Sequence, residues 1–141
     1  LLFLLKASNI FNLNQKNSFY AKLHIQGINS DTYLLNELIR FGGINNLRGF
    51  EENSINASKL GVLASEYRYQ LSPTLYVHSI IDAGYFESPT VSNQKLYGFG
   101  FGFGLLTDAG LLKFNLANGQ TEHQNFKFSD SKIHLSLSAT F

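Results

Sequence analysis

The 141-residue sequence contains no cysteine, no methionine and no tryptophan, and neither sign of charge prevails. Without cysteine the chain forms no disulfide and no Cys-ligated metal site, although this absence does not fix the redox compartment. The 11 Lys and Arg residues nearly balance the 10 Asp and Glu residues, so charge gives no argument for nucleic acid or an acidic substrate as a partner. No apolar run approaches the roughly 18 residues of a membrane-spanning helix.

The chain opens on "LLFLLKASNIF", without a basic leader or a cleavage motif before it. We therefore expect it to be part of a longer protein.

Apolar and polar side chains alternate with a period of two along most of the chain, whereas a period of 3.6 is almost nowhere present. This alternation is typical of β-strands that have two unlike faces. It predicts an all-β fold with about seven strands, in the stretches 2–13, 18–27, 59–71, 74–86, 97–105, 111–117 and 132–141.

The connections between these strands differ in length in a regular way. Short turns alternate with long joins, and the sequence has 13 Phe and 7 Tyr residues, many of them near strand ends. Both features favour an antiparallel transmembrane β-barrel over a soluble β-protein, which would also alternate. The short turns are expected at 14–18, 72–74 and 107–110, and the long joins at 29–57, 87–94 and 118–130.

One strand, "YGFGFGFGLL", has glycine at every second position. If its aromatic side chains face lipid, the glycines face the lumen and leave that wall bare. Glycine allows another backbone to approach closely, and it also lets a barrel wall bend. The strand alone leaves both interpretations open for Gly98, Gly100, Gly102 and Gly104.

The long join 29–57 carries a Gly-Gly pair followed by the tetrapeptide "LRGF". This pattern resembles the conserved motif of the BamA/TamA superfamily of outer-membrane β-barrel assembly proteins, also called the bacterial surface antigen family. In that family the motif lies on a loop folded back into the barrel lumen. The likeness continues in the strands 65–71 and 80–86. The motif residues here are Gly42, Gly43, Leu47, Arg48, Gly49 and Phe50.

The resemblance implies a partner for the motif arginine. The strand 80–86 is similar to the family strand whose Asp-x-Gly element faces the loop, so we expect Arg48 to meet Asp82, and also Glu66. A planar guanidinium can hold a carboxylate through two hydrogen bonds, which would fix the loop. The alternative is that Arg48 is a solvated charge at a loop tip.

The last strand is similar to the terminal recognition signal of outer-membrane proteins, through Ile133, Leu135, Leu137, Ala139 and Phe141. The family barrel is larger and is preceded by periplasmic POTRA domains. The resemblance therefore implies that residues 1–141, with the loop 29–57, are the C-terminal part of such a barrel, and we expect no POTRA domain within them. Two positions depart mildly from the family pattern: Ser136 stands where glycine is common, and Ile81 where an aromatic residue is common.

The resemblance implies a non-enzymatic protein of the bacterial outer membrane that inserts or translocates other outer-membrane proteins. Its expected partners are outer-membrane lipid, unfolded outer-membrane clients, periplasmic chaperones and accessory lipoproteins. No cofactor, metal or nucleic acid is implied. The alternatives are a pore, a two-partner secretion transporter, a barrel attached to a patatin-like lipase, or a soluble β-protein. His24, His78 and His134 lie on polar faces and are interpreted as lumen-lining.

Overall fold

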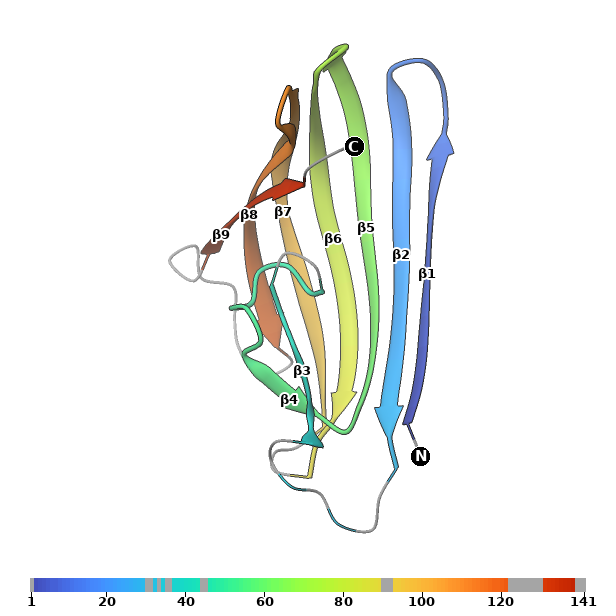
Figure 1. The fold of residues 1–141 in the computed structure, drawn as a ribbon, viewed down its shortest axis with the longest axis vertical. Coiled ribbons are helices and arrows are strands. Elements are labelled where there is room, and N and C mark those ends of the chain that lie inside the picture. The colour runs from blue at the N-terminus through green and yellow to red at the C-terminus, as the bar shows by residue number, and fades with distance from the viewer. Residues whose placement is uncertain are drawn as a thin grey trace.

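A computed structural model describes residues 2–29, 32, 34, 37–43, 46–89, 93–121 and 131–138. Seven strands form one antiparallel sheet in the order β1-β2-β5-β6-β7-β8-β9 (Figure 1). Within the described residues, no helix has the length and apolarity that crossing a membrane requires. The strands of the sheet are β1 (Leu2–Asn12), β2 (Asn17–Ile28), β5 (Lys59–Ser72), β6 (Leu75–Glu87), β7 (Gln94–Thr107), β8 (Gly110–Thr121) and β9 (Ser131–Ser138).

The expected all-β fold with seven antiparallel strands is confirmed. The three short turns lie at the same end of the sheet, at the top of Figure 1. The largest boundary error is at the end of β8, which continues through Asn118 to Thr121, where the sequence predicts a join over 118–130. The strand predicted over 97–105 is also longer, because β7 runs from Gln94 to Thr107. β8 is longer than its side-chain alternation predicts because its backbone continues to pair with β7, Asn118 with Phe99 and Gly119 with Gly98.

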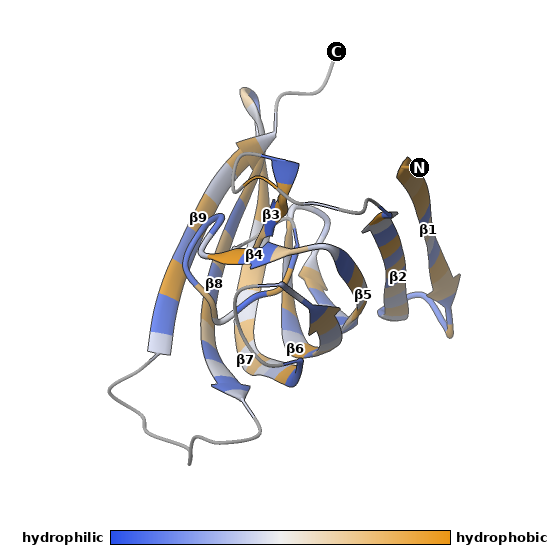
Figure 2. Cartoon of the chain, turned by 90° about the horizontal axis from the view of Figure 1, so that it is seen from below, coloured by the Kyte–Doolittle hydropathy of each residue, from blue (hydrophilic) through white to orange (hydrophobic). Residues whose placement is uncertain are grey.

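The long join 29–57 has more structure of its own than its sequence indicates. It contains β3 (Ile39–Phe41) and β4 (Ile55–Ala57), which pair antiparallel as a separate two-stranded sheet. Figure 2 shows this small sheet inside the curve of the large one. Three-residue strands are too short to give a readable alternation, which explains why sequence periodicity misses them. The loop is therefore folded against the inner face.

A hydrophobic core joins the loop to the inner face of the large sheet. The rings of Phe41 in β3 and Phe86 in β6 meet edge to face, with centroids 5.8 Å apart. Leu47, next to the motif arginine, is completely buried. Burial of these side chains on folding drives the loop against the wall. The core consists of Phe41, Leu47, Ala57, Leu60, Val62, Phe86 and Leu96.

The outer face of the large sheet is apolar and exposed. Ile81 in the middle of β6 is 65% exposed, whereas its neighbours Ile80 and Asp82 on the inner face are each 1% exposed. The two faces therefore differ in environment as sharply as a barrel wall requires. Large apolar side chains on the outer face include Leu63, Tyr67, Tyr69, Leu71, Val77, Tyr85, Tyr97, Phe101, Ile133, Leu135 and Leu137.

Replacing Ile81 with Arg tests whether this outer face meets lipid. A cation facing hydrocarbon at mid-strand costs about 2–4 kcal/mol, so Ile81→Arg should lower the unfolding free energy of the intact protein in liposomes by that amount. Urea titration followed by mobility on a cold gel measures the loss. Gln70→Arg, on the inner face of β5, is the control and should cost far less. Equal losses for the two variants would contradict a lipid-facing outer wall.

Candidate functional site

The glycines of the loop motif let the loop turn sharply and pack closely. Gly49 has a φ of 95°, a conformation that residues with a Cβ rarely adopt. A Cβ at Gly49 would lie 2.5 Å from the backbone nitrogen of Gly119 in β8. Glycine at this position thus serves both the turn and the contact between two backbones. Gly42 and Gly43 also have positive φ angles, of 113° and 105°.

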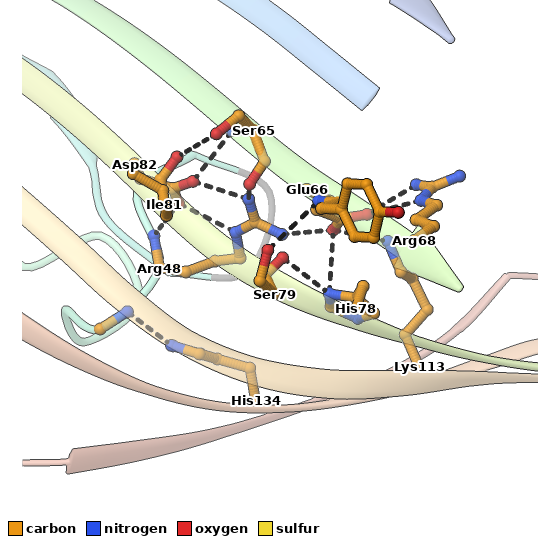
Figure 3. A network of polar contacts seen from close by, with 12 residues as sticks. Arg48, Ser65, Glu66, Arg68, His78, Ser79, Ile81, Asp82, Lys113 and His134 are labelled. Carbon is orange, nitrogen blue, oxygen red and sulfur yellow. Dashed lines mark hydrogen bonds and ion pairs between the residues drawn. The ribbon is translucent and has the colours of Figure 1, made fainter. Parts of the chain in front are cut away.

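Arg48 projects from the loop into the inner wall and is 4% exposed (Figure 3). Its Nε donates to Asp82 Oδ2 at 2.9 Å, and its Nη2 donates to Asp82 Oδ1 at 2.6 Å. Its Nη1 donates to Glu66 Oε1. Nη2 also donates to the carbonyl oxygen of Ser65 at 3.1 Å. Each nitrogen of the guanidinium therefore has a partner on β5 or β6.

The backbone of the loop is bound at the same point. The N–H of Arg48 donates to Asp82 Oδ2 at 3.1 Å, so one carboxylate holds both the side chain and the main chain of this residue. Burial alone lowers the pKa of Arg48, but hydrogen bonding and attraction from Asp82, together with attraction from Glu66, outweigh it and raise the pKa above its usual value. The cation is thus retained inside the wall.

Glu66 is the centre of a larger group of basic side chains, of which the sequence predicts only His78, as a lumen-lining residue. Arg68 Nη2 lies 2.7 Å from Glu66 Oε2, and Lys113 Nζ in β8 lies 3.3 Å from Oε1. His78 Nδ1 is 3.8 Å from the same carboxylate. Residues Arg68, His78 and Lys113 lie on polar faces by strand parity, which is the signal that could have indicated them.

Two aromatic rings lie against Arg68 in this group. The guanidinium carbon of Arg68 lies 4.7 Å from the ring centroid of Tyr20 and 5.1 Å from that of Tyr76. Cation–π attraction at such distances adds to the ion pair with Glu66. The cluster therefore draws side chains from β2, β5, β6 and β8 as well as from the loop.

The ladder between β5 and β6 is interrupted behind this cluster. Backbone pairing stops after Ser65–Ile81 and resumes at Arg68–His78. In the gap, the N–H of Tyr67 donates to the hydroxyl of Ser79 at 3.3 Å. The hydroxyl of Ser65 donates to the carbonyl of Ile81 at 2.6 Å. Side chains thus replace part of the main-chain ladder where Arg48 is bound.

The loop also contacts the last described strand. The N–H of Gly49 donates to His134 Nε2 in β9 at 3.1 Å. Near the surface, Lys132 Nζ lies 3.7 Å from Glu51 Oε1. Phe50 lies partly buried against the hydrophobic core. The motif "LRGF" therefore bridges β5 and β6 on one side to β8 and β9 on the other.

The four alternating glycines of β7 do not share one role. A Cβ at Gly98 would overlap the carbonyl oxygen of Arg48, so this position admits the loop backbone. A Cβ at Gly100 or Gly102 would instead overlap the neighbouring strand, at Leu116 and Asn115 respectively. At Gly104 the obstacle is the ring of Tyr76. Close approach of the loop holds for Gly98, and tight curvature of the wall fits Gly100 and Gly102.

The terminal strand is described in part. Ile133, Leu135 and Leu137 lie on the outer face and are 59–67% exposed. Ala139 and Phe141 lie outside the described residues. The terminal signal therefore stays a prediction. Among the described residues, no group of three His, Asp or Glu side chains is arranged to hold a metal ion.

Removing the guanidinium should release the loop. Arg48→Ala leaves Asp82 buried without its cation, and breaking a buried pair in this way costs about 3–5 kcal/mol. We expect faster proteolysis within 29–57 in the intact protein, with Arg48→Lys in between because lysine cannot make the bidentate contact. Arg40→Ala, at an exposed position of β3, is the control. Cleavage of Arg48→Ala at the same rate as the wild-type protein would contradict a role for Arg48 in fixing the loop.

A methyl group at Gly98 should displace the loop without touching any charge. Its Cβ would overlap the backbone of Arg48, which cannot move aside as a flexible side chain could. Hydrogen–deuterium exchange at the amides of Arg48 and Gly49 should therefore accelerate in Gly98→Ala. Gly61→Ala is the matched control, because a Cβ at Gly61 meets no atom within 4 Å. Exchange that is equally slow in both variants would show that the loop does not depend on this contact.

Comparison with known protein families matches residues 3–141 to the Omp85 superfamily domain. No curated protein matches the sequence significantly. The family match covers nearly the whole chain, and it agrees with the antiparallel sheet whose apolar face points outward. Omp85 domains are characteristic of bacterial outer-membrane proteins, in a family that assembles or translocates other proteins. The chain therefore belongs to the Omp85 superfamily of bacterial outer-membrane proteins.

Proposed function

We propose that this chain is the C-terminal barrel part of an outer-membrane assembly factor, in which β9 offers the edge opposite β8 to the incoming strand of a client. The position of β9 carries this proposal. Within the described part of the chain, β9 pairs with β8 on one side and lies at the end of the sheet.

An unpaired strand edge in a membrane is a strong site for β-augmentation. Backbone N–H and C=O groups that face hydrocarbon without partners each cost several kcal/mol, and an added strand satisfies them. The outward side chains of Ile133, Leu135 and Leu137 already suit lipid, so a client strand joining β9 extends a wall of the same polarity. No bond has to be cleaved for this exchange.

The loop supports the proposal from the inner side. Gly49 binds His134 of β9, and the adjacent Arg48 is bound to the carboxylates of β5 and β6. Inward Ser136 and Ser138 are small, so the loop supplies contacts that the strand's own side chains lack. In this scheme the pinned loop keeps β9 in register with β8 while its other edge receives the client.

The partners that this scheme requires are unfolded outer-membrane proteins, delivered by periplasmic chaperones, with accessory lipoproteins acting on the same barrel. The client contacts the protein through main-chain pairing, which is tolerant of sequence. A non-enzymatic role follows from the same mechanism. The energy for insertion then comes from strand pairing and from burial of the client's apolar face in lipid.

Photo-crosslinking during insertion tests the proposal. The intact protein in liposomes would carry a photoreactive phenylalanine analogue at Leu135 in β9 or at Ile81 in β6, which are 66% and 65% exposed on the same outer face. A reporter outer-membrane protein should crosslink to position 135 while it inserts, and not to position 81. Adducts at both positions, or at neither while insertion proceeds, would contradict the use of this edge. A third variant would carry the probe at Gln70, on the inner face of β5. Adducts at Gln70 in place of position 135 would favour a transporter.

A further inference from the structure

The outer face carries an apolar groove that neither the loop nor the sheet edge accounts for. It has a volume of about 520 Å³ and spans the outward side of β5, β6, β7 and β8. Volumes of this size, lined mainly by hydrophobic and aromatic groups, are typical of small-molecule sites. The groove is lined by Tyr67, Tyr69, Val77, Ser79, Phe101, Phe103 and Phe114, together with His78 and Gly102.

The walls of the groove are held in place by contacts of the lining side chains with one another and with β2. Phe103 and Phe114 stack at the β7–β8 side, with centroids 5.4 Å apart and an interplanar angle of 19°. On the opposite side, the hydroxyl of Tyr67 donates to Asn17 Oδ1 in β2 at 2.6 Å. These contacts fix the rings that flank the groove. The site is therefore formed before any ligand enters it.

The groove includes residues at the interruption in the β5–β6 ladder. Ser79 is at this point, and its hydroxyl is already engaged by the N–H of Tyr67. A serine between larger outward side chains leaves the depression in the wall. The remaining lining is almost wholly carbon, so a ligand gains from burying apolar surface rather than from polar recognition.

The groove lies in the half of the wall nearest the short turns. Tyr69 precedes the end of β5 at Ser72 by three residues, and Phe114 follows the start of β8 at Gly110 by four. In bacterial outer-membrane barrels the short turns are periplasmic. The exposed Lys16 lies in the neighbouring turn, where its carbonyl accepts from the N–H of Gln70 at 2.7 Å. The chain thus carries a lysine in the turn beside the end of β5, the strand that contributes Tyr67 and Tyr69 to the groove.

We propose that this groove is a binding site for one acyl chain of a phospholipid in the periplasmic leaflet. The groove is continuous with the lipid-facing wall of an outer-membrane protein, so hydrocarbon is the medium that covers it. Its volume and aromatic lining distinguish it from the rest of that wall, and a lysine in the adjacent turn attracts an anionic phosphate headgroup. The site requires only the outer-membrane location and is independent of how clients are inserted.

Photolabelling by a lipid tests this site. The intact protein would be reconstituted in vesicles of phosphatidylethanolamine and phosphatidylglycerol that contain a phosphatidylethanolamine with a diazirine at mid-chain. Peptide mapping should find labelling at Phe101 several-fold above that at Leu135, although the two are similarly exposed at 62% and 66%. Labelling in proportion to exposure over the whole outer face would mean annular lipid only and would overturn the proposal.

Two variants on the same face of β6 sharpen the test. Val77→Trp fills the groove and should abolish the excess labelling at Phe101, whereas Ile81→Trp lies outside the groove and should leave it unchanged. A cold-gel mobility shift verifies that each variant is folded. If Val77→Trp does not fold, the comparison of Phe101 with Leu135 in the wild-type protein still tests the site. Preferential labelling by a diazirine-bearing lipid A in place of the phospholipid would assign the groove to the other leaflet and overturn the proposed source.

Discussion

The burial of a single guanidinium determines how the loop and the wall fit together. A charge removed from water is tolerated only when its partners are close and its donors are used, and Arg48 meets both conditions through Asp82, Glu66 and the carbonyl of Ser65. These partners lie on two adjacent strands, so the loop has one position in which the charge is compensated. Gly98 leaves room for the loop backbone in that position, and the hydrophobic core around Leu47 packs the loop there.

Part of this site could be predicted from strand parity and part could not. Asp82 and Glu66 are readable because each lies on the polar face of a long alternating strand. Strand parity shows which face a residue lies on, but not which residues of other strands lie beside it. The contact between Lys113 and Glu66 depends on the register of β8, which parity does not give. The same limit applies to His134, whose contact with Gly49 depends on how deeply the loop enters the curve of the sheet.

The fold departs from its sequence pattern where both faces of a strand are apolar. In β5, Leu60 and Val62 point inward into the core while Leu63 points outward, so the alternation becomes visible only from Glu66 onward. The alternation therefore marks only the polar half of the inner face, whereas the half of the wall next to the loop is hydrophobic. At Asn118 and Gly119 the sequence predicts a loop, because asparagine and glycine are poor strand formers. Both residues nevertheless belong to β8, because their backbones pair with β7.

Arg48 and Gly49 are joined by one planar peptide unit, and this proximity has a mechanical consequence. The side chain at one end of the unit is bound in the charged cluster of β5 and β6, and the N–H at its other end is bound to β9. A rigid unit of this kind cannot stretch to absorb a displacement of the terminal strand. When β9 moves, the unit must either rotate or lose its contact at one end. Displacement of the sheet edge and the ion pairing of the buried Arg48 side chain are therefore coupled.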